Sequence, residues 1–358
     1  MKIDTIKLNN FRNYKNTSIN LKAGLNFIVG KNAQGKTNLL ESIYLLSVGK
    51  SPKNSKDKQL IMFNETKSKI EIDFETIAGK KNIQMYLDKT NKKAIKINNL
   101  NILKITELVG CLSVVFFSPD ELKLIKEVPE DRRTFLDVSI SQFDKSYLYN
   151  LIKYEKILKQ RNTILKSLDS DETKLEQLKL FTPQLIDTAE KIIKKRLEFI
   201  ENLKKIAKNI HTLITIDENL SVDYSYKPKE NISIYDDLVD TFNKNVDKEL
   251  ELKYTCFGPH RDDIIFKIND LDCKYYASQG QQRTVALVIK LALMEVIKKE
   301  IGEYPVLLLD DVLSELDSAR QNRLLKLCTQ FQTLITCTKI PDIDLNYNEI
   351  KIENGKII

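Results

Sequence analysis

Histidine, cysteine and long apolar runs are scarce in this chain of 358 residues. The two histidines, His211 and His260, are a poor supply for a histidine-based zinc site or a Ser-His-Asp triad. The five cysteines form no Cys-x-x-Cys pair, and their odd number argues against a disulfide framework. These gaps leave little support for a zinc protein, a triad hydrolase or a disulfide-built scaffold.

Signals for membranes and export are missing as well. No run of about 18 apolar residues is present, so we expect no transmembrane helix and no membrane partner. The start of the chain, MKIDTIKLNNFRNYK, holds no apolar signal segment, which predicts a cytoplasmic location.

The composition is otherwise that of a globular protein. Hydrophobic residues make up 42% and charged residues 30%, and the length predicts about two domains. The net charge of +7 is compatible with nucleic-acid binding, but lysine used as ordinary surface charge explains it equally well.

The hydrophobic pattern divides the chain into α/β ends and a helical middle, with a strong helix start at Ser118-Pro119 and a helix entry at Pro183. The predicted strands are Lys2–Leu8, Ser18–Leu21, Leu25–Val29, Lys69–Ile77, Asn82–Leu87, Ala94–Ile97, Leu112–Phe117, Ile264–Ile268, Cys273–Ala277, Val306–Leu309 and Thr333–Thr336. The predicted helices are Lys36–Leu46, Gln184–Thr212, Ser278–Glu300 and Ser318–Gln330.

A phosphate-binding motif follows the strand predicted at Leu25–Val29. Residues 30–37 read G-K-N-A-Q-G-K-T and match GxxxxGK[ST] between a strand and a helix. Gly30 and Gly35 let the backbone curl around phosphate, so that amides and the helix N-terminus point at it. Lys36 can reach the β- and γ-oxygens and Thr37 can bind Mg²⁺, so the pattern predicts nucleotide binding.

An acidic pair ends the apolar strand at Val306–Leu309. Asp310 is expected to hold Mg²⁺, directly or through water, and Asp311 to orient or activate the attacking water. A solvated strand end is the alternative interpretation. Because most of the chain separates Lys36 from Asp310, a large insertion must divide one nucleotide-binding domain, and the helical middle is the natural candidate.

A helix start at Ser278 adds a third element. Ser278 and Gln281 have the spacing of a capping box, which by itself indicates only a well-capped helix. However, the phosphate loop, the Ser-Gln-Gly-Gln helix, the Asp-Asp strand and then Ser314-x-Leu-Asp317 follow one another in an order that resembles ABC-type ATPase heads. In those heads Ser314 and Asp317 would belong to the D-loop.

The ABC resemblance implies a shared site. The signature of one subunit, here Ser278, Gly280 and Gln281, serves the phosphate loop of the other, which implies an ATP-dependent homodimer with two nucleotides. Thr336 and Cys337 stand where many ABC proteins carry a switch histidine, so the sensor of the γ-phosphate stays open.

Seven local strings make the resemblance more specific, because together they are similar to the RecF recombination-mediator family. They are Phe11-Arg12-Asn13-Tyr14, Asn32 to Glu41, Phe117 to Leu122, Arg132 to Asp137, Gly258-Pro259-His260-Arg261-Asp262-Asp263, Ser278 to Arg283 and Asp310 to Asp317. The match is specific in the first and last thirds of the chain, and an Asp at position 311 in place of the usual ABC Glu is typical of that family.

The resemblance implies an α/β fold: an ABC-type P-loop ATPase head assembled from N- and C-terminal segments (1–130 and 253–358), with an inserted, mainly helical arm domain (131–252). The expected nucleotide-binding residues are Gly30, Lys31, Asn32, Ala33, Gln34, Gly35, Lys36, Thr37 and Asn38, together with Arg12. For Arg12 a surface turn is the alternative. For Arg132 and Arg133 a DNA or interdomain role and a solvated helix start both stay open. Lys36 and Asp311 are the expected catalytic residues, and Thr37 and Asp310 the metal ligands.

The resemblance also implies the biology: an ATP-dependent DNA-binding protein of recombinational repair and replication restart, associated with the nucleoid and with the SOS response. It would act on double-stranded and gapped DNA with RecO- and RecR-like mediators and a RecA-type recombinase, with ATP and Mg²⁺ as cofactors. Hydrolysis would be weak, stimulated by DNA, and would reset the dimer. The first alternative is an SMC-like structural head, but this sequence shows no long heptad arm of the kind that such a head carries. The second alternative is an ABC-headed nuclease-associated ATPase, but the sequence shows no appended acidic metal cluster.

Overall fold

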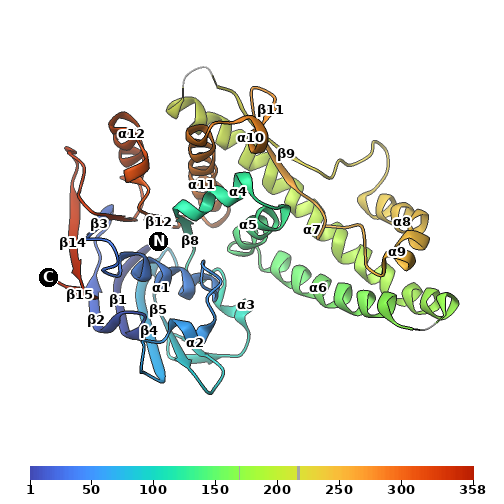
Figure 1. Cartoon of the computed structure of the whole chain (residues 1–358), viewed down its shortest axis with the longest axis horizontal. Coiled ribbons are helices and arrows are strands. Elements are labelled where there is room, and N and C mark those ends of the chain that lie inside the picture. The colour runs from blue at the N-terminus through green and yellow to red at the C-terminus, as the bar shows by residue number, and fades with distance from the viewer. Residues whose placement is uncertain (169, 216–217) are drawn as a thin grey trace. The chain divides into compact units, whose positions relative to one another are not determined.

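The computed structural model describes residues 1–168, 170–215 and 218–358, and its backbone divides into two compact units (Figure 1). Unit 1 holds Met1–Leu122, Leu213–Ile216 and Ala286–Ile358, and unit 2 holds Lys123–Thr212 and Asp217–Val285. This division rests on compactness, whereas the boundaries at 130/131 and 252/253 rest on motifs and stay a prediction.

Unit 1 contains a six-stranded sheet that joins distant parts of the chain. Its order is β15-β14-β3-β13-β12-β8, and all neighbours are parallel except the last hairpin, β14–β15. The strands are β3 (Leu25–Val29), β8 (Val114–Phe117), β12 (Val306–Asp310), β13 (Thr333–Cys337), β14 (Tyr347–Glu353) and β15 (Lys356–Ile357). The head is therefore assembled from N- and C-terminal segments, as predicted.

A second, antiparallel sheet has the order β2-β1-β4-β5-β6-β7. Its strands are β1 (Lys2–Phe11), β2 (Tyr14–Asn20), β4 (Lys67–Thr76), β5 (Gly79–Asp88), β6 (Ala94–Ile97) and β7 (Leu100–Ile102). The helix α1 (Lys36–Val48) contacts strands of both sheets. Its sequence has no continuous polar face, and a helix that is apolar on all sides is stable only when it is covered on all sides.

The remaining helices of unit 1 are short or peripheral to these sheets. They are α2 (Asp57–Leu60), α3 (Ile105–Leu108), the 3₁₀ turns η1 (Pro119–Leu122) and η2 (Leu313–Glu315), α12 (Ser318–Cys328) and residues 286–301 of α11 (Gln279–Ile301).

Unit 2 is mainly helical. It contains α4 (Lys123–Lys126), α5 (Pro129–Ser141), α6 (Lys145–Lys166), most of α7 (Asp171–Ile214), α8 (Ile234–Lys244), α9 (Val246–Leu252), α10 (Cys273–Tyr276) and the first turns of α11. A three-stranded sheet with the order β11-β10-β9 completes it, built from β9 (Leu220–Tyr224), β10 (Ile264–Ile268) and β11 (Leu271–Asp272).

Buried arginines hold the elements of unit 2 together. The Arg161 guanidinium of α6 donates to Glu249 of α9 at 2.5 Å and to Thr255 at 2.8 Å. Arg196 of α7 donates to Asp137 of α5 at 2.7 Å and to the carbonyl of Pro259 at 2.6 Å. Because removing one partner of a buried ion pair leaves an uncompensated charge, these contacts specify how the helices meet.

The Gly258–Asp263 turn belongs to the same polar core. Burial lowers the pKa of His260 to about 4, so the ring is neutral and bridges the Tyr154 hydroxyl at 2.6 Å and the Thr255 carbonyl at 3.1 Å. Arg132 is buried and pairs with Asp263 at 2.6 Å. Arg133 donates to the Asp262 carbonyl at 2.9 Å, so the two arginines bind this turn and do not form a solvated helix start.

Two details of the predicted secondary structure are wrong. Pro183 lies inside α7 and does not begin the helix, which starts at Asp171. The strand predicted at Cys273–Ala277 is the helix α10, because the Asp272 side chain caps it by accepting from the Lys274 amide at 2.8 Å. A helical segment does start at Pro119 after Ser118, as predicted, but its first turn is the 3₁₀ helix η1, which leads directly into α4 at Lys123.

The bounds predicted for β3, β6 and β10 are confirmed residue for residue. In the part of the chain that the structure describes, no helix is both long and apolar enough to cross a bilayer.

Candidate functional site

The loop between β3 and α1 has the close contacts that its two glycines permit. A Cβ atom on Gly30 would lie 2.4 Å from the carbonyl oxygen of Ile352, on the neighbouring strand β14. Gly35 has φ +112°, and a Cβ there would overlap the Asn13 side chain. Neither position accepts a larger residue, so both glycines of the motif are required by the backbone geometry.

Side chains from other segments of unit 1 donate hydrogen bonds to the carbonyl groups of this loop. The Asn13 amide donates to the Gln34 carbonyl at 2.9 Å, and the buried Tyr14 hydroxyl donates to the Gly35 carbonyl at 2.9 Å. Asn38, in the first turn of α1, donates to Asn13 Oδ1 at 2.9 Å. With its carbonyl oxygens occupied in this way, the loop is prepared to direct its amides toward an anion.

The Lys36 ammonium lies at the centre of the loop. Its Nζ donates to the carbonyl of Gly30 at 2.5 Å and to that of Lys31 at 2.9 Å. The stem is buried, so the charge is held in one place, and a phosphate bound by the loop would meet it directly.

Beside the loop, Asp310 collects two hydroxyl groups on one oxygen. Oδ1 accepts from Thr37 of α1 at 2.9 Å and from Thr336 of β13 at 2.8 Å. The pairing of β12 with β13 places Asp310 opposite Thr336, at the carboxyl ends of the parallel strands, where open α/β sheets bind ligands. Asp310 and Thr37 therefore provide two adjacent oxygens of the kind that Mg²⁺ prefers.

Asp311 has a backbone conformation unusual for a residue with a side chain. Its φ is +52°, in the left-handed region. The Asp311 amide donates to Thr336 Oγ1 at 2.9 Å, and its carbonyl accepts from Ser314 Oγ at 2.8 Å. Among the described residues no hydrogen bond reaches its carboxylate, and Asp311 is one of the residues that line the pocket.

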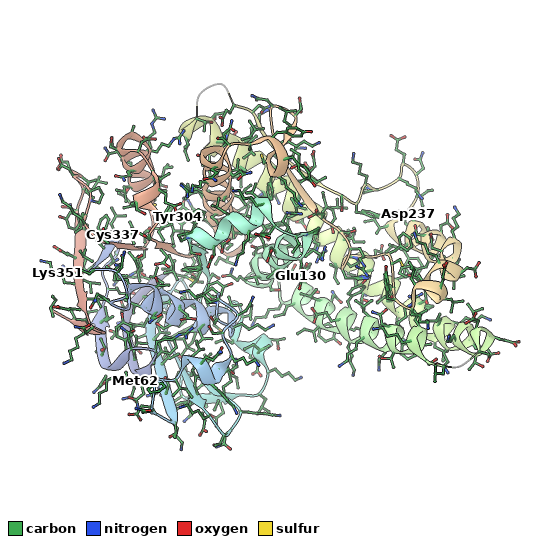
Figure 2. The ribbon with its side chains drawn as sticks, in the orientation of Figure 1. Met62, Glu130, Asp237, Tyr304, Cys337 and Lys351 are labelled. Carbon is green, nitrogen blue, oxygen red and sulfur yellow. The ribbon has the colours of Figure 1, made fainter. Side chains whose placement is uncertain are left out.

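These groups surround one pocket of about 320 Å³. Its lining consists of Asn32, Ala33, Gln34, Gly35, Lys36, Thr37, Asn38, Lys53, Asp310, Asp311 and Thr336. The phosphate-loop residues and the acidic pair predicted from the sequence thus lie together, except that Gly30 and Lys31 contribute the carbonyls that Lys36 binds. Figure 2 labels Cys337, which ends β13 next to Thr336.

Arg12 is engaged with protein groups next to this pocket. Its guanidinium donates to both oxygens of the buried Glu41 of α1, at 2.8 and 2.9 Å, and to Ser55 at 2.8 Å. It also lines a neighbouring cavity of about 440 Å³ with Asn13 and Asn38. A nucleotide contact by Arg12 stays a prediction, and the structure adds that Arg12 ties α1 to the segment that follows it.

The residues predicted to form the signature lie in unit 2, at the start of α11. The predicted capping box is present: the Ser278 amide donates to Gln281 Oε1 at 2.8 Å, and the Gln281 amide donates to Ser278 Oγ at 3.3 Å. Ser278 and Gly280 are exposed. Asp317 of the predicted D-loop caps α12 by accepting a hydrogen bond from the Arg320 amide at 2.9 Å, and Ser314 donates to the Asp311 carbonyl as described.

Two pocket residues were missed by the sequence analysis. Lys53 lies in an irregular segment after α1 that resembles no motif, although its lysine-rich composition was visible. Thr336 was noted only as a departure from the switch histidine, whereas it binds Asp310 and the amide of Asp311.

A phosphate loop on a parallel strand, an acidic pair on the strand two places away and a capped Ser-Gln-Gly-Gln helix start define an ABC-type ATPase head. A family model described as RecF/RecN/SMC N terminal domain matches residues 2–351. The chain belongs to this family, and within it to the RecF proteins.

The similar proteins agree along the whole chain. The "DNA replication and repair protein RecF" of Clostridium tetani is 44% identical, with 100% of both chains covered, and that of Staphylococcus carnosus is 43% identical with the same coverage. A solved structure described as "Structure of the recombination mediator protein RecF-ATPrS in RecFOR pathway" is 36% identical with a TM-score of 0.91, covering 99% of this chain and 97% of that one. An Smc head bound to the C-winged helix domain of ScpA is 15% identical, with a TM-score of 0.59 and coverage of 100% and 98%, and shows the fold alone.

We expect Lys36→Ala to weaken ATP binding strongly, because the loop would lose the only cation at its centre among the described residues. Truncating one partner of a buried charge pair costs about 2 to 5 kcal/mol, which corresponds to roughly 30-fold or more in affinity. Titration with a fluorescent ATP analogue measures the effect, and the exposed Lys15→Ala serves as the matched control. Equal affinity in the two variants would contradict the assignment of the phosphate site.

Proposed function

We propose that this protein is an ATP-dependent DNA-binding protein of recombinational repair and replication restart. It binds Mg²⁺-ATP, dimerises around the nucleotide at junctions of duplex and single-strand gap DNA, and assists the loading of a recombinase. Weak hydrolysis, stimulated by DNA, resets the dimer. The observation that carries the proposal is the contact of Thr37, Asp310 and Thr336 beside the Lys36 loop.

The residues of the pocket fit Mg²⁺-ATP. The loop offers amides and the Lys36 ammonium to phosphate. The two RecF structures described as RecF-ATP and RecF-ATPrS support ATP as the ligand. Thr37 and Asp310 would hold Mg²⁺, which usually takes one or two protein oxygens and completes its shell with phosphate and water.

Asp311 is the group best placed to act on water. Its backbone N–H and C=O are both hydrogen-bonded, it lines the pocket, and its carboxylate has no hydrogen bond from the described residues. We assign it the role of orienting or activating the attacking water, with Lys36 stabilising charge on the transferred phosphoryl group.

Gly280 supports a signature that acts in trans. A Cβ atom there would meet no atom of the described residues within 4 Å, so their packing gives no reason for a glycine. A helical glycine costs about 1 kcal/mol relative to alanine. A close approach from outside explains it, and the phosphate of a nucleotide held by a second copy fits the exposed Ser278 and the amides at the start of α11.

DNA and partner proteins complete the proposal. The net charge of +7 suits a phosphate backbone. The relatives' names, with replication, repair and the RecFOR pathway, support RecO- and RecR-like mediators as partners. The proposal adds a RecA-type recombinase, a cytoplasmic, nucleoid-associated location and a link to the SOS response.

Asp311→Asn is expected to bind Mg²⁺-ATP normally but to lower hydrolysis by about 100-fold or more, because positioned acid–base groups contribute about 10²- to 10⁴-fold. The variant should therefore accumulate as an ATP-bound dimer. Phosphate release and dimer mass with Mg²⁺-ATP measure the two effects, with the exposed Asp344→Asn as control. Hydrolysis at the wild-type rate would mean that another group activates the water.

Ser278→Arg tests the shared site. The bulky cation should leave ATP binding by a single chain intact while abolishing ATP-dependent dimers and hydrolysis. Ser233→Arg is the matched control, because Ser233 caps α8 of the same unit by accepting from the Asp236 amide at 3.0 Å. Both variants should lose about 1 kcal/mol of helix stability, but only Ser278→Arg should lose assembly.

Mixing Ser278→Arg with Lys36→Ala chains extends this test. The heterodimer has one intact phosphate loop facing one intact signature, so part of the hydrolysis should return. Persistent ATP-dependent dimers in Ser278→Arg alone would rule out the in-trans signature.

DNA binding should depend on salt and little on sequence. If Lys and Arg neutralise backbone phosphates, the logarithm of affinity falls linearly with the logarithm of salt concentration, by about 0.9 for each phosphate contacted. Fluorescence anisotropy with two gapped duplexes of equal length and unrelated sequence, from 50 to 300 mM salt, measures both properties. An affinity that is independent of salt, or that differs more than about tenfold between the sequences, would contradict backbone recognition.

A further inference from the structure

Glu218, which belongs to no motif, contacts the signature loop of its own unit. Its Oε1 accepts a hydrogen bond from Nε2 of Gln281 at 2.9 Å. The other end of the same amide, Oε1 of Gln281, accepts from the backbone N–H of Ser278 at 2.8 Å. Both ends of the Gln281 side chain are therefore occupied by protein groups.

The Glu218 carboxylate and the Ser278 N–H select the same orientation of this amide. An ionised Glu can only accept hydrogen bonds, so the NH₂ group of Gln281 must face Glu218 and its oxygen must face Ser278. That orientation is the one the capping box requires, since the Ser278 N–H needs an acceptor. Without Glu218, the amide loses one of the two groups that select this orientation, and only the Ser278 N–H still favours it.

The same arrangement leaves the Ser278 hydroxyl able to donate outward. Its Oγ accepts a hydrogen bond from the Gln281 backbone amide at 3.3 Å, and the capping box does not use the hydrogen of the hydroxyl itself. Ser278, Gln279 and Gly280 are exposed, while Gln281 is half-buried and Gln282 is buried. The loop is thus anchored at Gln281 and presents its first residues to solvent.

Glu218 also meets the end of the long helix α7. Its Oε2 lies 3.5 Å from Nε2 of His211, a buried residue in the last turn of that helix. Burial lowers the pKa of His211, although the nearby Glu218 acts in the opposite direction. The carboxylate therefore touches both the last turn of α7 and the first turn of α11.

We propose that Glu218 is a positioning residue for the signature, which holds Gln281 so that Ser278 and Gly280 can engage the nucleotide of a second copy. This inference rests on the proposed function of the signature in trans. Glu218 acts through Gln281 and does not itself touch the nucleotide.

The test compares Glu218→Ala with Glu218→Gln and with the control Glu201→Ala, an exposed position on α7. ATP affinity of the single chain, dimer mass with Mg²⁺-ATP and hydrolysis are measured for each. Glu218→Ala should keep the ATP affinity but lose about tenfold in hydrolysis and in dimer affinity, the usual size of one lost hydrogen bond to a charged group. Glu218→Gln should recover most of the loss, because its amide oxygen still accepts from Gln281.

A second arm separates positioning from general stability. Glu218→Ala chains mixed with Lys36→Ala chains should regain hydrolysis, since the heterodimer pairs an intact loop with an intact signature. Mixed with Ser278→Arg chains they should regain none, because neither chain carries a competent signature. A loss of stability alone would not depend on which partner is supplied.

The outcomes distinguish this inference from the function on which it rests. ATP-dependent dimers in Ser278→Arg would remove the signature in trans, and with it the role of Glu218. Loss of dimers in Ser278→Arg together with wild-type behaviour of Glu218→Ala would overturn the positioning role alone. Failure of Glu218→Gln to recover activity would overturn the hydrogen bond to Gln281 as its basis.

Discussion

The site depends on one carboxylate oxygen, Oδ1 of Asp310, which accepts the hydroxyl groups of Thr37 and Thr336. These three residues come from α1, β12 and β13, so their contact requires β3, which precedes α1, to pair with β13, and β13 to pair with β12. Each pairing is parallel, and parallel strands need a crossover connection rather than a tight turn. The chain can therefore insert a whole helical unit between β3 and β12 without disturbing the site.

The two units are stabilised by different kinds of interaction. In unit 1, α1 is covered by two sheets, and the phosphate loop at its start is held from behind by Asn13 and Tyr14, so little reorganisation is needed to bind an anion. In unit 2, buried arginine pairs such as Arg161 with Glu249 specify the packing of helices. Such pairs specify the relative orientation of the helices more than they add net stability, because the cost of desolvating the charges offsets most of their attraction.

Local sequence patterns predicted correctly those elements for which all the local signals favour the same secondary structure. The bounds of β3 and the start of α1 were predictable because an apolar run, a glycine-rich loop and a helix follow one another with no other reading. Cys273–Ala277 was mistaken for a strand, because Tyr and Cys favour strands while the deciding cap, Asp272, lies outside the apolar run. Pro183 was mistaken for a helix start, because tertiary packing continues α7 through it and overrides the local penalty of proline.

By itself the sequence determined the phosphate loop, the acidic pair and the capping box, since each consists of residues that are close along the chain and require particular side chains. Only the tertiary structure decided that Lys53 and Thr336 line the pocket, that Arg12 is bound to Glu41, and that Glu218 holds Gln281. Those contacts join segments from different elements, and side chains so far apart in sequence meet only after strand order and helix packing are set.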